Sequence, residues 1–250
     1  MSRPRSELWS TAPSATGPRR AANMSPRWSV LERRHDNGAQ TLSGAQSPSL
    51  ELYLIRHGET EWSLSGQHTG RTEIGLTARG REGARELAPY LTGIAFARVL
   101  TSPRQRARQT CELAGLGGAA EIEPDLAEWD YGDYEGKRSA EIWEERPGWD
   151  IFRDGCLGGE TPAQVSDRAD RLVERLRALQ GNVALFSHGH FGRVLAVRWI
   201  DLPVIKARHF ALGTASLSIL GRQASDPDTS LMTLWNFDPS RRLAAGPPAS

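Results

Sequence analysis

An apolar run ends in arginine, histidine and glycine at Leu52-Tyr53-Leu54-Ile55-Arg56-His57-Gly58-Glu59-Thr60. A run of this kind predicts a buried strand, and parallel sheets present functional side chains at the carboxyl ends of their strands. The pattern returns at Val183-Ala184-Leu185-Phe186-Ser187-His188-Gly189. Either histidine alone could be a core or turn residue, but two strand-end histidines, each followed by glycine, predict one shared site.

Strands and helices alternate along the rest of the ordered region. In chain order, we expect a helix capped by Thr77, a strand over 97–101, a helix over 104–114 opened by Pro103, a long helix after the capping box Thr161–Gln164, a strand over 183–187, a helix over 191–200, and two edge strands over 215–220 and 231–236. This alternation predicts an α/β protein, a three-layer α/β/α sandwich with a mostly parallel central sheet.

The composition indicates one domain with a tail at each end. Residues 1–48 are rich in Ser, Pro, Ala and Arg without any period, which predicts a disordered N-terminal extension. Residues 49–237 form the predicted domain, and 38% hydrophobic composition is enough for a core. Residues 238–250, with three prolines, are predicted to be a flexible C-terminal tail.

The charge balance excludes several classes of partner. Lys+Arg 31 against Asp+Glu 30 gives a net charge of +1, which favours neither nucleic acid nor a membrane surface, so any anion site must be local. Cys111 and Cys156 lie far apart with no matching histidine cluster, so we expect no metal and no cofactor. No apolar stretch approaches ~20 residues and no signal sequence begins the chain, which predicts a cytoplasmic protein.

The predicted fold brings an anion site together from separate segments. Arg56, His57 and His188 end strands, and Arg106 lies in the first turn of the helix after Ser102-Pro103. With the helix N-terminal amides after Gly189, these donors suit a tetrahedral oxyanion such as a phosphoryl group.

A proton donor is expected beside this anion site. Glu128 is the candidate, because Trp129 and Tyr131 could shield it from water, although a loop glutamate on its own is usually a surface residue. Glu59 and Asp130 remain alternatives for the role.

Five blocks of sequence, spaced over nearly all of the predicted domain, resemble the histidine phosphatase superfamily, also called phosphoglycerate mutase-like. The blocks are Arg56-His57-Gly58-Glu59-Thr60 with Thr69-Gly70 and Leu76-Thr77, Ser102 with Arg106-Ala107 and Gln109-Thr110, Glu128 with Tyr131-Gly132 and Glu135-Gly136, Gly159-Glu160-Thr161, and Ser187-His188-Gly189-His190.

The resemblance implies a role for each matching residue. His57 would be the phosphorylated nucleophile, Glu128 the acid, and Arg56, Arg106 and His188 the groups that hold the phosphoryl group. Ser63, Thr69, Gly70 and Gly189 would contact the substrate.

The segments 67–72 and 128–136 look closest to those of bacterial acid phosphatase-type members. Similar sequences occur in sedoheptulose-bisphosphatase-type members. Residues 136–159 are short beside the long insertion of cofactor-dependent phosphoglycerate mutases, and Ser63 stands where many members have asparagine. We therefore expect a metal-independent hydrolase that acts through phosphohistidine on a small phosphorylated metabolite.

Two other functions stay open. One is a 2,3-bisphosphoglycerate-dependent phosphoglycerate mutase, and the other is a non-catalytic phosphate-binding module. Metal hydrolase chemistry is less favoured because no Asp/His cluster at ligand spacing accompanies the histidines. The sequence decides neither the natural substrate nor the oligomeric state, a homo-oligomer included.

Overall fold

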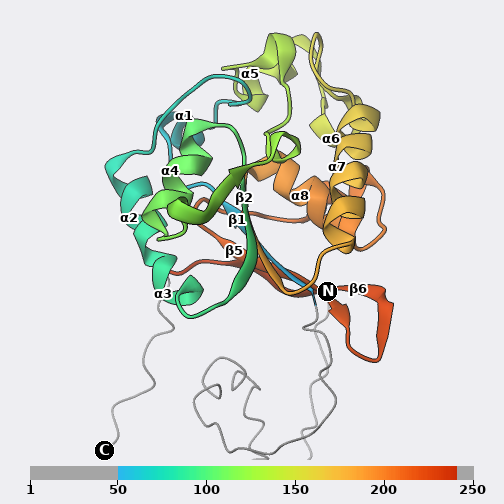
Figure 1. Cartoon of the computed structure of the whole chain (residues 1–250). Coiled ribbons are helices and arrows are strands. Elements are labelled where there is room, and N and C mark those ends of the chain that lie inside the picture. The colour runs from blue at the N-terminus through green and yellow to red at the C-terminus, as the bar shows by residue number, and fades with distance from the viewer. Residues whose placement is uncertain (1–49, 241–250) are drawn as a thin grey trace, which may run out of the picture. The chain divides into compact units, whose positions relative to one another are not determined.

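The computed structural model of the protein describes residues 50–240, in which a six-stranded sheet has helices on both faces (Figure 1). Its strands lie in the order β3-β2-β4-β1-β5-β6. The first four run parallel, whereas β5 and β6 run antiparallel to their neighbours. The strands are β1 (Glu51–Arg56), β2 (Phe96–Thr101), β3 (Ala120–Ile122), β4 (Asn182–Ser187), β5 (Leu217–Gln223) and β6 (Asp226–Phe237).

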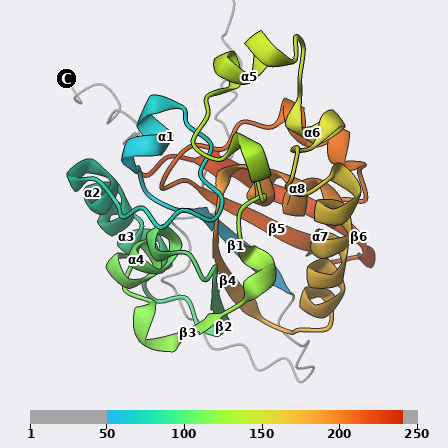
Figure 2. The same cartoon turned by 90° about the horizontal axis from the view of Figure 1, so that it is seen from above.

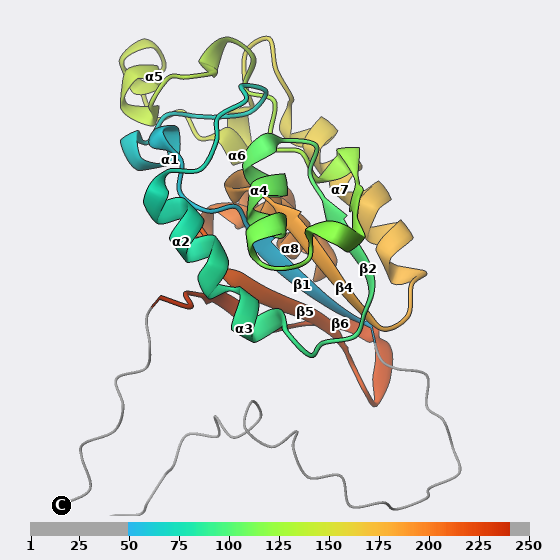
Figure 3. The ribbon, with the colours of Figure 1, turned by 60° about the vertical axis from the view of Figure 1, so that its left-hand side comes forward.

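Alternate residues of the strands pack into two hydrophobic cores, one on each face of the sheet. Leu52 and Leu54 of β1 belong to the core beneath α7 and α8, while Tyr53 and Ile55 belong to the core beneath α2, α3 and α4. Successive strand side chains point to opposite faces, so a fully apolar strand needs cover on both sides. Figure 3 shows the two helical layers; their helices are α2 (Ala78–Glu86), α3 (Ala88–Leu91), α4 (Gln105–Leu113), α7 (Pro162–Arg177) and α8 (Gly189–Trp199).

Shorter elements gather near the carboxyl ends of β1, β2 and β4, as the view from above shows (Figure 2). They include α1 (Glu61–Ser65), α5 (Ser139–Glu145) and α6 (Ile151–Asp154). The described part of the chain also contains four 3₁₀ segments: Gly117–Ala119, Pro124–Leu126, Gly132–Tyr134 and Val204–His209. Within residues 50–240, none of the helices has the length and apolar character needed to cross a membrane.

Both predicted helix caps are confirmed. The Thr77 hydroxyl accepts from the Gly80 amide, and the Thr161 hydroxyl accepts from the Gln164 amide at 3.2 Å. The Gln164 side chain in turn accepts from the Thr161 amide at 2.8 Å, which completes the capping box. With 16 residues, α7 is the longest helix in the described part of the chain.

The fold class is confirmed, and the edge-strand prediction needs correction. β5 pairs with β1 on one side and β6 on the other, so only β6 of the two C-terminal strands lies at an edge. The opposite edge is β3, whose three residues are too few to show a period. The extension predicted for 1–48 and most of the predicted tail lie outside the described residues.

Candidate active site

Three neighbouring parallel strands place the predicted site residues at their carboxyl ends, on one side of the sheet. β4 lies between β2 and β1, with Arg56 beside Ser187 and Thr101 beside Phe186. The residues that follow these strand ends are therefore neighbours in space. The rings of His57 and His188 meet edge to face with centroids 5.1 Å apart, as the shared-site prediction requires.

The His57 ring is oriented by its own backbone. Its Nδ1 lies 2.7 Å from the Gly58 carbonyl oxygen, so Nδ1 carries the proton and Nε2 keeps a lone pair. Burial, then the charges of Arg106 and Arg56, lower the pKa of His57 well below its usual 6.5. Gly58 is required here because a Cβ at this position would lie 2.4 Å from the Gly80 carbonyl oxygen.

His188 is held at both ring nitrogens. Its Nδ1 accepts from Arg106 Nε at 3.2 Å, and its Nε2 lies 2.7 Å from the Ser102 hydroxyl. Burial, then the charge of Arg106, lowers the pKa of His188 well below its usual value, so the ring is neutral and donates through Nε2. A ligand can receive a hydrogen bond from His188 only if one of these contacts is exchanged.

Arg106 is fully buried under the segment before α2. Besides its bond to His188, it donates to the carbonyl oxygens of Thr69 at 2.8 Å, Gly70 at 3.2 Å and Thr72 at 3.1 Å. A guanidinium has five N–H donors, so one N–H of Nη1 remains for a ligand.

Arg56 retains an unused buried donor. Its Nη1 donates to the Leu212 carbonyl at 2.5 Å, but its buried Nε has no hydrogen-bond partner among the described residues. Gly189 lies so close that a Cβ there would be 3.1 Å from Arg56 Cζ. A buried donor without a partner is costly, so the Arg56 Nε position suits an anionic ligand.

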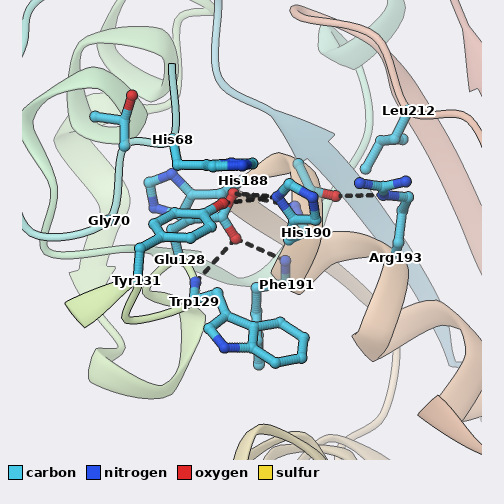
Figure 4. A network of polar contacts seen from close by, with 12 residues as sticks. His68, Gly70, Glu128, Trp129, Tyr131, His188, His190, Phe191, Arg193 and Leu212 are labelled. Atoms are coloured by element: carbon cyan, nitrogen blue, oxygen red, sulfur yellow. Dashed lines mark hydrogen bonds and ion pairs between the residues drawn. The ribbon is translucent and has the colours of Figure 1, made fainter. Parts of the chain in front are cut away.

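Glu128 sits at the N-terminus of α8 (Figure 4). Its Oε1 accepts from the amides of Trp129 at 3.0 Å and Phe191 at 2.7 Å, and its Oε2 accepts from the His190 amide at 3.0 Å. The sequence prediction that these helix N-terminal amides contact an oxyanion is therefore wrong for His190 and Phe191. Their ligand is the Glu128 side chain, which they hold in one orientation.

The loop that carries Glu128 is anchored by Arg168 of α7. The Arg168 guanidinium donates to the carbonyl oxygens of Asp125 and Ala127, both at 2.8 Å. It also forms a two-pronged ion pair with Glu160, both contacts at 2.8 Å, and Glu160 accepts from the Asp130 amide at 2.9 Å. This network fixes both ends of the segment that contains Glu128.

These groups surround a pocket of about 190 Å³. The predicted site residues that line it are Arg56, His57, Ser63, Thr69, Glu128 and Gly189. Arg106 and His188 do not line the pocket. They are hydrogen-bonded to each other next to His57, and both residues are 0% exposed. Gly70 is not part of the lining, and its amide donates to the Glu135 carboxylate at 3.0 Å.

The structure separates the three candidate acids. Glu59 lines a different and larger cavity of about 520 Å³ and accepts from the Thr77 hydroxyl at 2.8 Å. Asp130 pairs with the exposed Arg71. Glu128 is thus the candidate acid that faces the pocket with His57.

Sequence reasoning did not assign several further lining residues. His68 stacks on Tyr131 with ring centroids 4.7 Å apart, and the Tyr131 hydroxyl lies 2.6 Å from His190 Nδ1. Arg193 also lines the pocket. Its position four residues after Gly189 on α8 was the available signal, because helical residues at that spacing share a face.

The model of the histidine phosphatase superfamily (branch 1) matches residues 52–235. The chain belongs to this superfamily. It is a histidine phosphatase, a phosphoric monoester hydrolase, as the resemblance implied.

Named relatives agree with this assignment. An acid phosphatase from Mycobacterium tuberculosis is 47% identical over 175 residues, which cover 68% of this chain and 85% of that protein. The sedoheptulose 1,7-bisphosphatase of Saccharomyces cerevisiae is 37% identical over 194 residues, covering 64% and 71%. A solved structure of a Mycobacterium tuberculosis open reading frame has a TM-score of 0.71 and 39% identity, covering 76% of this chain and 98% of that one.

The anchor of the Glu128 loop gives a stability prediction for the phosphatase. Arg168→Met should lower the free energy of unfolding by about 3 kcal/mol, because two carbonyl oxygens and the Glu160 carboxylate lose their donor. Arg171→Met is the matched control on the same helix: its side chain is 58% exposed and lies 3.7 Å from Asp125, so we expect a change below about 0.5 kcal/mol. Urea unfolding of both variants measures the difference, and equal changes would contradict the anchoring role.

Proposed function

We propose that this phosphatase hydrolyses small phosphomonoesters through a phosphohistidine at His57. The observation that carries the proposal is the 2.7 Å contact between His57 Nδ1 and the Gly58 carbonyl. It leaves the Nε2 lone pair for attack on phosphorus, and the lowered pKa keeps the ring neutral under mildly acidic conditions. In the first step the Nε2–P bond forms while the bond from phosphorus to the leaving oxygen breaks.

The transferred phosphoryl group is held by Arg56, Arg106 and His188 in this proposal. Phosphoryl transfer has a loose transition state, so catalysis depends on positioning and on stabilisation of the equatorial oxygens. The unpartnered Nε of Arg56 and the remaining Nη1 donor of Arg106 supply contacts for those oxygens. His188 contributes its Nε2–H donor once the contact of Nε2 with the Ser102 hydroxyl is exchanged for the phosphoryl group.

Glu128 serves as acid and then as base. Protonated Glu128 gives its proton to the leaving oxygen, and the resulting carboxylate accepts a proton from the water that attacks phosphohistidine. The second step forms the water O–P bond, breaks the Nε2–P bond and releases inorganic phosphate. The three backbone amides that orient Glu128 support this role, since a proton shuttle must stay in reach of both steps.

The mechanism needs no metal ion. The guanidinium groups of Arg56 and Arg106 already supply the positive charge that a metal would bring to the phosphoryl oxygens, and neutral His188 adds a hydrogen-bond donor. Among the described residues, no group of three or more His, Cys, Asp or Glu is arranged to hold one. The named relatives, an acid phosphatase and a sugar bisphosphatase, support an enzyme of the acid phosphatase type that acts on a small phosphorylated metabolite. The proposal also includes a cytoplasmic location.

The placement of residues 136–159 outside the pocket lining favours hydrolysis over mutase activity. A mutase must keep water from phosphohistidine until an alcohol acceptor returns, which requires a closing cover. No residue between 136 and 159, the segment that contains α5 and α6, lines the pocket in the described structure. Attack of water on the phosphohistidine therefore does not require that segment to move.

The test follows 3-phosphoglycerate with and without added 2,3-bisphosphoglycerate. We expect phosphate release to exceed isomerisation to 2-phosphoglycerate by at least about tenfold under both conditions, because water reaches the intermediate first. Phosphate release and isomer formation are measured in the same samples. Isomerisation that depends on the bisphosphate and outpaces hydrolysis would make the mutase the correct function.

A further inference from the structure

Glu135 is a carboxylate near the phosphoryl site that takes part in none of the proposed reaction steps. It is half-buried, lies seven residues after Glu128 and does not line the pocket. Both of its oxygens lie 3.0 Å from the Gly70 amide nitrogen, and Oε1 also accepts from the Thr72 amide at 3.0 Å. Within residues 50–240 it forms no ion pair. The ligands of this carboxylate are therefore backbone amides.

Arg106 binds the same backbone segment, residues 69–72, through its carbonyl oxygens. Three of these oxygens accept from the guanidinium. The Thr69 carbonyl and the Gly70 amide belong to one planar trans peptide group, so its C=O and N–H point in opposite directions. The oxygen of this peptide lies 2.8 Å from Arg106 Nη2, and its nitrogen lies 3.0 Å from the Glu135 carboxylate. One peptide group thus connects the cation to the anion.

The position of Arg106 depends on this segment. Arg106 is 0% exposed and forms no ion pair in the described part of the chain, and burial lowers its pKa. The carbonyl oxygens are therefore the groups that stabilise its charge. A hydrogen bond to a peptide whose other end binds an anion is strengthened by polarisation. A change at Glu135 should shift the guanidinium and, through Nε, its 3.2 Å contact with His188.

Gly70 allows the segment to approach the carboxylate. A Cβ at this position would lie 2.6 Å from the Trp129 carbonyl oxygen and 2.8 Å from Glu135 Oε2. A larger residue would push the segment away from Glu135, because neither contact leaves room for a methyl group. The 69–72 segment is thus held between Arg106, Glu135 and the loop that carries Glu128.

We propose that Glu135 is a positioning residue of the phosphoryl site. It holds the 69–72 segment, which determines the position of the Arg106 guanidinium and, through Arg106, that of His188. The inference rests on the proposed role of Arg106 in binding the transferred phosphoryl group. Glu135 makes and breaks no bond in the reaction. It acts on the geometry of the donors around phosphorus, on which stabilisation of the transition state depends.

Glu135→Ala should lower kcat/KM for 4-nitrophenyl phosphate by about 30-fold or more and raise the inhibition constant of orthovanadate by a similar factor, since both depend on the Arg106 donors. Glu135→Gln keeps one acceptor oxygen, so its losses should lie between those of alanine and the wild type. A loss of folded enzyme alone would lower Vmax and leave the vanadate constant unchanged.

Glu145→Ala is the matched control. Glu145 is 58% exposed, pairs with Lys137 at 2.8 Å and does not line the pocket. Both constants of this variant should stay within about twofold of the wild-type values, because an exposed ion pair contributes little.

A double-mutant cycle shows whether Glu135 acts through Arg106. Arg106→Lys keeps the charge but cannot make the set of guanidinium contacts. Residues in one network are not additive, so Glu135→Ala should cost less than about threefold in the Arg106→Lys background. Circular dichroism reports whether each variant is folded. If Arg106→Lys does not fold, the vanadate constants of Glu135→Gln and Glu145→Ala decide the question.

The outcomes separate this inference from the proposed function. Wild-type constants in both Glu135 variants would show that the inference is wrong while the hydrolase stands. The same holds for a lower Vmax with an unchanged vanadate constant, or for an undiminished loss in the Arg106→Lys background. A wild-type enzyme that hydrolyses no phosphomonoester would overturn the proposed function, and this inference with it.

Discussion

His57→Ala is expected to lower kcat/KM for every phosphomonoester by at least about 10⁴-fold, because the variant lacks the Nε2 that attacks phosphorus in the proposed mechanism. His57 is 5% exposed and its side chain makes a single hydrogen bond, to Gly58, so the alanine variant should keep its fold. Activity on 4-nitrophenyl phosphate and thermal unfolding of the same sample measure both properties. His209→Ala, which removes an exposed histidine, is the control and should retain full activity.

The covalent intermediate gives a second measurement on the same residue. Wild-type enzyme quenched in alkaline denaturant during turnover of ³²P-labelled substrate should carry acid-labile label on the peptide that contains His57, and His57→Ala should carry none. The pKa of His57 lies well below 6.5, so the neutral ring persists as pH falls from 7 to 5.5. The single-turnover rate of phosphorylation should therefore show no loss from His57 protonation in that range. Label on another residue, or activity in folded His57→Ala, would contradict the mechanism.

The central part of the fold was predictable because its signals are local. The apolar runs of β1 and β4 are long enough to require a buried parallel sheet, and the Thr161–Gln164 capping box fixes the start of α7. Adjacent parallel strands share a carboxyl edge, so the pairing of His57 with His188 follows from the same patterns.

Features that depend on tertiary partners were not predictable. β5 and β6 have similar strand patterns, and only their pairing shows that β5 is internal. Within α7, Arg168 and Arg171 are equivalent as sequence, yet the fold buries the first against the Glu128 loop and exposes the second. The α8 amides looked available to a ligand because the sequence does not show that Glu128 reaches them.

Glu128→Gln is expected to separate substrates by their leaving groups. For glycerol 3-phosphate, whose alkoxide needs a proton in order to leave, kcat/KM should fall by about 10²–10⁴-fold. Nitrophenolate leaves without protonation, so phosphorylation of His57 by 4-nitrophenyl phosphate should slow far less. Glutamine preserves the shape of the side chain and an acceptor oxygen for the amides of Trp129 and Phe191.

Hydrolysis of the phosphohistidine, the second step of the reaction, gives the sharper test of Glu128. Water still needs a base to attack phosphohistidine, so Glu128→Gln should release nitrophenol in a rapid burst of about one equivalent per active site, followed by a slow steady state. Asp130→Asn is the matched control, because Asp130 pairs with the exposed Arg71 and does not line the pocket. It should show neither the burst nor the leaving-group dependence. Equal losses for both substrates without a burst would mean that Glu128 only maintains the structure, and a burst in Asp130→Asn would transfer the acid–base role to that residue.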